Sequence, residues 1–155
     1  MFAAIRDFFD DMMPTAKDGS PTFNMKDKRL SAAVLMAYAI AADGKVTIEE
    51  QKKLLSVLQK HYKLSGNEAD LLADKAREAQ ARSVDFFQFT NSLKNQMDMS
   101  ERLGLIEDMW EMVYADGELH EQEDNLVWRV AELLNVTSEQ RMALKRIVRD
   151  RLAGA

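Results

Sequence analysis

The chain has 155 residues, of which 46% are hydrophobic and 30% are charged, and this is enough sequence for about one packed domain. It contains no cysteine and only two histidines, which excludes a disulfide framework, thiolate metal sites and a site built mainly from imidazoles. The net charge of -5 argues against nucleic acid as the main partner. Because no run of 18 apolar residues occurs, we expect no transmembrane segment and a cytoplasmic location.

Residues 1–25 are expected to form an amphipathic helix and a linker, followed by a helical domain over 26–155. One face of the predicted helix is apolar and the other is mostly acidic. The apolar residues are Phe2, Ile5, Phe8, Phe9 and Met12, and the polar ones are Arg6, Asp7, Asp10 and Asp11. The start lacks the basic region of a secretory signal. The pattern favours packing on the domain or on a partner over weak binding at a membrane surface.

Apolar residues keep a helical period through the rest of the chain, and no stretch alternates with period two. We therefore predict an all-α bundle of seven or eight helices. After the N-terminal segment the helices cover about 26–42, 47–63, 65–82, 83–95, 100–115, 120–135 and 137–152. Capping boxes mark three of the helix starts, at Thr47, Ser65 and Thr137, each with Glu or Gln three residues later.

The sequence contains an internal repeat with an offset of 73 residues. Ala42-Asp43-Gly44 aligns with Ala115-Asp116-Gly117, and Glu50 aligns with Glu123. After a gap of one residue the next helices also align. Two copies are too few for a solenoid, so we predict one domain with an internal pseudo-two-fold relation.

Each Asp-Gly turn places an aspartate at the C-terminal end of an apolar helix, where the helix dipole disfavours a negative charge. A left-handed helix end explains the glycines, and a capping box explains Glu50 without a ligand. Glu123 is the clearer indication, because His120 stands at its cap position and caps poorly. A divalent cation between the turns would remove the charge conflict. The candidate metal ligands are Asp43, Glu50, Asp116 and Glu123.

The second turn lies in an acidic run. Between Glu107 and Asp124 there are eight acidic residues and no Lys or Arg. Such a run is either a solvated face or a set of carboxylates bridged by a cation. Hard oxygen ligands suit Ca²⁺, Mg²⁺ or Mn²⁺, and His120 would admit Zn²⁺. Each turn matches the second half of an EF-hand loop, but the first acidic ligands are missing, so neither turn can wrap calcium alone.

The paired motif of an apolar helix, Ala-Asp-Gly, an apolar residue and a glutamate resembles the TerB-like tellurite-resistance domain family, over about Leu30 to Leu152. The resemblance implies an all-helical domain with two-fold character, and an association with bacterial stress response and membrane-linked metal-sensing complexes. It implies that the four candidate carboxylates hold a divalent metal, with Glu49 and Glu118 as helpers. Some relatives carry a J-domain co-chaperone module, but this sequence has no His-Pro-Asp motif, so that activity is not implied.

Two functions stay open from the sequence. The first is a non-enzymatic metal-binding sensor or adaptor, and the second is a metal-free protein–protein interaction module whose acidic cluster docks a partner. An enzyme is disfavoured, since the sequence has no cysteine, no Glu-x-x-His pair and no phosphate-binding glycine loop, which leaves only metal-assisted hydrolysis. We expect a protein partner, which the family association places near membranes, and either a monomer or a weak homodimer.

Two other features have a structural interpretation. Trp110 and Trp128 lie in apolar stretches and are predicted to be buried in the core. The last helix carries a basic stripe, predicted to be a solvated face or a surface for an acidic partner or lipid headgroups. The stripe consists of Arg141, Lys145, Arg146, Arg149 and Arg151.

Overall fold

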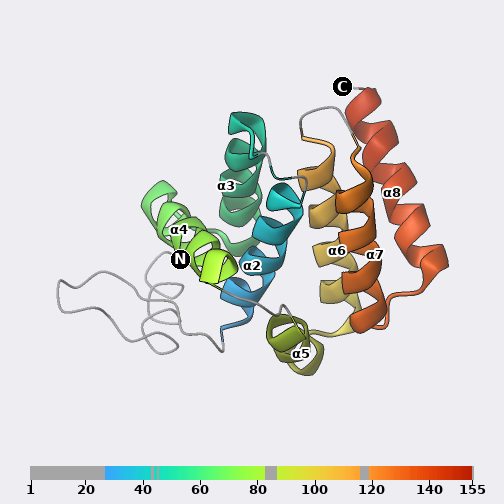
Figure 1. Ribbon diagram of the computed structural model, residues 1–155, viewed down its shortest axis with the longest axis horizontal. Helices are drawn as coiled ribbons and strands as arrows, with labels where there is room; N and C mark the ends of the chain where they lie inside the picture. The colour runs from blue at the N-terminus through green and yellow to red at the C-terminus, as the bar shows by residue number, and fades with distance from the viewer. Residues whose placement is uncertain (1–26, 43, 45, 83–86, 116–118, 155) are drawn as a thin grey trace.

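The computed structural model describes residues 27–42, 44, 46–82, 87–115 and 119–154 (Figure 1). In these ranges all regular structure is helical, which confirms the predicted all-α fold. The helices are α2 (Lys28–Ala41), α3 (Ile48–Tyr62), α4 (Gly66–Arg82), α5 (Phe87–Gln96), α6 (Met99–Val113), α7 (Glu121–Leu133) and α8 (Ser138–Ala153). The helix and linker predicted over 1–25 lie outside the described residues. None of the described helices is long and apolar enough to cross a bilayer.

Local capping explains where the helices begin. In each of the three predicted capping boxes, the N-cap side chain accepts from the backbone N–H three residues later, and the side chain of that residue accepts in return. These pairs are Thr47 with Glu50, Ser65 with Glu68 and Thr137 with Gln140. The sequence reading missed a fourth box, in which Asp98 and Glu101 start α6 one residue earlier than expected.

Helix α2 forms the centre of the bundle. Eleven of its 14 residues are buried. It contacts α3 and α4 on one side and α6 and α7 on the other, with α5 below in Figure 1. A helix that is apolar around its whole circumference is stable only when other helices surround it. The core continues into α6, where Met109 and Trp110 are completely buried, which confirms the prediction for Trp110.

The prediction that Trp128 is a core residue was wrong. Its side chain lies on α7 and is 45% exposed. The neighbours that do enter the core from α7 are Val127, Val130 and Ala131. These positions follow the helical period, and Trp128 falls just outside the stripe that they form.

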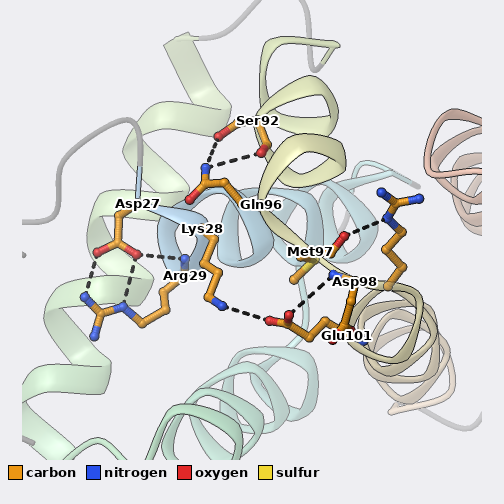
Figure 2. A network of polar contacts seen from close by, with 9 residues as sticks. Asp27, Lys28, Arg29, Ser92, Gln96, Met97, Asp98 and Glu101 are labelled. Carbon is orange, nitrogen blue, oxygen red and sulfur yellow. Dashed lines mark hydrogen bonds and ion pairs between the residues drawn. The ribbon is translucent and has the colours of Figure 1, made fainter.

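A polar network joins the N-terminal ends of α2 and α6 (Figure 2). Asp27 caps α2 by accepting from the backbone N–H of Arg29, and its carboxylate also pairs with the Arg29 guanidinium at 2.7 Å. Both side chains of this pair are buried. Next to it, Nζ of Lys28 lies 2.8 Å from Oε2 of Glu101 in the first turn of α6. Because both helices begin here and contact each other, they run parallel.

Several local features recur at the aligned positions of the repeat. Lys63 after α3 and Asn135 after α7 both adopt left-handed backbone conformations, with φ of 52° and 60°. The next residue in each copy donates its N–H five residues back, from Leu64 to Gln59 and from Val136 to Ala131. Both helices therefore end in the same type of C-cap. The pseudo-two-fold relation between whole halves stays a prediction.

Replacing Asp27 with alanine is expected to destabilise the fold by about 3–5 kcal/mol, because it removes the buried carboxylate that pairs with the Arg29 guanidinium. The matched control is Asp98→Ala, which removes an exposed N-cap and is expected to cost only about 1 kcal/mol. Urea unfolding followed by circular dichroism measures both. Equal losses in the two variants would show that the buried ion pair adds nothing beyond the cap.

Candidate metal centre

The two Asp-Gly turns of the sequence connect helices whose ends meet at one end of the bundle. Since α2 and α6 begin together and run parallel, their C-terminal ends also lie together, at the top of Figure 1. Glu49, in the first turn of α3, and Ala115, just after α6, line the same cavity of about 580 Å³. An ion pair between Lys53 and Glu111, at 3.3 Å, joins α3 to α6 nearby. The described flanks of both turns are therefore neighbours.

Two of the four predicted ligands, Asp43 and Asp116, lie outside the described residues. Among the described residues, no group of three or more His, Cys, Asp or Glu side chains is arranged to hold a metal ion. A complete ligand set would thus need the two aspartates. Gly44, which follows the first of them, has a φ of 80°, so its backbone conformation alone explains the glycine.

Glu50 is completely buried at the third position of α3. Its Oε1 accepts from the backbone N–H of Thr47 at 2.9 Å, as the capping box requires. The interpretation of Glu50 as a capping residue is therefore confirmed for Oε1. Capping alone does not require Glu50 to be buried, because Glu68 makes the same capping hydrogen bond at the start of α4 and is not buried.

Glu123 is the second completely buried glutamate, at the third position of α7. The N-cap residue His120 makes no side-chain capping hydrogen bond, in agreement with the sequence argument. Instead Nε2 of His120 lies 3.9 Å from Oε1 of Glu123. Glu50 and Glu123 thus occupy equivalent positions in the two copies, and both carboxylates are withdrawn from solvent.

Three of the eight residues of the acidic run pair with Lys or Arg side chains from α3 and α8. Arg151 of α8 pairs with Glu107 at 3.1 Å and with Glu111 at 2.8 Å, and Lys145 pairs with Asp124 at 3.5 Å. These contacts give two of the five residues of the basic stripe, Lys145 and Arg151, an intramolecular partner in the acidic run. The number of carboxylates that a cation would have to compensate is correspondingly smaller.

The sequence reading missed a buried acid on α6. Asp108 is 5% exposed and its Oδ2 lies 3.1 Å from Nδ1 of His61, on α3. Burial raises the pKa of Asp108 to about 8, and the nearby carboxylates of Glu111 and Glu107 act in the same direction. In the sequence, Asp108 lies at helical spacing between Leu105 and Met112, which are both buried, and this spacing could have predicted that Asp108 is buried too.

Asp108 and His61 line a cavity of about 360 Å³ with Tyr62, Lys28 and Glu101. Burial, together with the charge of Asp108, raises the pKa of Tyr62 as well. The cavity lies toward the N-terminal end of α6, because the Lys28–Glu101 ion pair borders it. It is therefore separate from the cavity lined by Glu49 and Ala115, and Asp108 is not a candidate ligand of the metal centre.

Asp108→Asn is expected to become more stable relative to the parent as the pH rises from about 4 to about 8. The carboxyl has a pKa of about 3.9 in an unfolded chain and about 8 in the fold, so its contribution to stability is complete below the lower value and is lost as the pH passes the higher one. Thermal unfolding over this pH range measures the difference. The exposed Asp150→Asn serves as control, and a constant difference between Asp108→Asn and the parent would contradict the expectation.

Comparisons with known proteins identify the family of this chain. The family model described as "Tellurite resistance protein TerB" matches residues 29–146. Two proteins named "Co-chaperone protein DjlA", from Vibrio vulnificus strains YJ016 and CMCP6, are each 29% identical over 114 residues, covering 71% of this chain and 39% of theirs. The chain thus spans well under half the length of these relatives, and no solved structure matches. Because the family model matches more than half of the sequence, the chain belongs to the TerB family.

Proposed function

We propose that this chain is a non-enzymatic domain that binds a divalent cation and acts as a sensor or adaptor. The ligands would be Asp43, Glu50, Asp116 and Glu123, drawn from both turns. The observation that carries the proposal is the complete burial of Glu50 and Glu123 at equivalent positions, beside helix ends that meet at one end of the bundle. The family membership supports it, because the sequence carries the paired motif in both copies.

The chemistry of the donor set fits a hard cation. An ionised carboxylate that is withdrawn from water is costly unless it is paired, hydrogen-bonded or bound to a metal. Glu50 and Glu123 would bring two such buried carboxylates to the ligand set. Four carboxylates and no thiolate favour Ca²⁺, Mg²⁺ or Mn²⁺, with Zn²⁺ admitted if His120 takes part.

The role of a sensor follows from where the ligands come from. Each turn supplies one aspartate and one glutamate, so neither copy of the repeat holds a complete set. Without a cation, four carboxylates brought close together would repel one another, and the C-terminal ends of α2 and α6 add negative partial charge. Cation binding would therefore draw the two turns together and fix the distance between the two copies.

The second candidate function is a metal-free module for protein–protein interaction, at a cytoplasmic or membrane-associated site. The observation that favours it is a set of exposed apolar side chains next to the turns, with Val46 at 44%, Ile48 at 66% and Leu119 at 38% exposure. Exposed apolar side chains of this kind are common at docking surfaces. The relatives are named as co-chaperones, which also fits a protein partner.

Isothermal titration calorimetry with Ca²⁺, Mg²⁺, Mn²⁺ and Zn²⁺ tests the metal site directly. The parent is expected to release or take up heat with at least one of these ions, whereas Asp43→Asn/Asp116→Asn is expected to lose the signal. Asp70→Asn, at an exposed position of α4, is the matched control and should bind like the parent. Absence of binding by the parent to every ion would leave the interaction module as the function.

Thermal unfolding gives an independent test at Glu123. An ion that binds only the folded state, at about 100 times its dissociation constant, adds about 2.7 kcal/mol to stability. The melting temperature of the parent should therefore rise with the ion identified by calorimetry, and that of Glu123→Gln should rise much less. Glu132→Gln, exposed on the same helix, should respond like the parent. An equal response of all three proteins would remove Glu123 from the ligand set.

A further inference from the structure

A groove between α7 and α8 exposes the largest aromatic side chain on the described surface. It has a volume of about 370 Å³ and is lined by Asp124, Asn125, Trp128, Arg141, Met142 and Lys145. Trp128 is 45% exposed and Met142 is 37% exposed. Both are side chains that commonly anchor a partner in a groove. The groove therefore offers an apolar floor to an amphipathic segment.

The two basic side chains of the groove differ in what they contact. Lys145 pairs with Asp124 at 3.5 Å and also lies over the ring of Trp110, 5.2 Å from its centroid. The Nε of Arg141 is buried and has no hydrogen-bond acceptor among the described residues. A buried donor without an acceptor costs free energy, and since Arg141 lines the groove, its positive charge attracts a carboxylate there. The groove is therefore prepared for an acidic occupant.

We propose that the occupant is this chain's own N-terminal segment, residues 2–12. The sequence pattern gives that segment an apolar face that includes Phe8 and Phe9, next to the acidic residues Asp10 and Asp11. An amphipathic helix that inserts apolar anchors into a groove is a common mode of recognition. The apolar face matches Trp128 and Met142, and the acidic residues match Arg141.

The connection between the segment and the domain is long enough for this placement. Residues 13–26 provide 14 residues before the described part begins at Asp27, and at about 3.3 Å per residue they span up to about 46 Å. A domain of this size has a radius of gyration of about 14 Å. Every face of the domain is therefore within reach, and the chemistry of the surface decides where the segment binds.

Charge selects the groove over the other exposed apolar surface. Val46, Ile48 and Leu119 lie beside the turns, where the nearby cavity is lined by two acidic and two basic side chains, Glu49, Glu111, Lys52 and Lys53. The N-terminal segment carries a net negative charge, so the balanced charges of that cavity give it no net attraction. In the groove, by contrast, two basic side chains stand against one acidic side chain, and the surplus positive charge attracts the segment. Because the segment is tethered, its effective concentration at the groove is in the millimolar range, so a partner that binds there has to displace it.

Tryptophan fluorescence of the full chain tests this proposal. The sequence has two tryptophans, and since Trp110 is completely buried, quenching by acrylamide reports on Trp128. In Phe8→Ser/Phe9→Ser the quenching constant is expected to rise and the emission maximum to move to longer wavelength, because Trp128 loses its cover. Arg141→Gln should shift both readouts in the same direction. Ile48→Ser, an exposed apolar position elsewhere, is the matched control and should behave like the parent.

The outcomes separate the proposal from its alternatives. If the parent and Phe8→Ser/Phe9→Ser are quenched equally, the segment does not cover Trp128 and the proposal is overturned. If only Arg141→Gln is without effect, the proposed contact between Arg141 and the acidic residues of the segment is absent, which overturns that part of the proposal. If quenching of the parent rises on dilution, the segment of a second copy occupies the groove, which overturns the intramolecular form. Circular dichroism of each variant verifies that the fold is retained.

Discussion

The burial of α2 is the constraint on which the rest of the structure depends. Eleven of its 14 residues are withdrawn from solvent, so the helix needs partners around its whole circumference. Neighbouring helices from both copies of the repeat supply this cover, and α2 contacts both α3 and α6. Neither copy can bury this helix alone, because α3 covers one side and α6 the other (Figure 1). The described helices of the two copies therefore share one hydrophobic core.

The parallel arrangement of α2 and α6 follows from this packing and determines where chemistry is possible. The ion pair between Lys28 and Glu101 fixes the beginnings of the two helices at one end of the bundle. Helices of 14 and 15 residues then finish at nearly the same height at the other end. An antiparallel pair would have placed the two Asp-Gly turns about 20 Å apart, which is too far for shared ligands.

The sequence predicted those features that depend on residues close together in the chain. The capping boxes at Thr47 and Thr137 join residues only three positions apart, so their partners can be read directly. The exposure of Trp128 could not be read, because it depends on which face of α7 the other helices cover. The contact between Asp108 and His61 also joins two helices that are distant in sequence. For the proposed metal centre, the candidate ligands were predicted from the sequence, whereas the proximity of the helix ends could be seen only in the fold.

Ion pairs between the acidic run and α8 connect this helix to the end of α6, beside the candidate metal centre. Arg151 contacts Glu107 and Glu111 near the end of α6, and its neighbour Leu152 lines the cavity between the flanks of the turns. The last turn of α8 is therefore held by the same helix end that carries the second Asp-Gly turn. A change in the separation of the turns would alter the position of these carboxylates relative to Arg151. Since α8 also forms one wall of the groove that contains Trp128, the cavity lined by Glu49 and Ala115 and this groove share one helix.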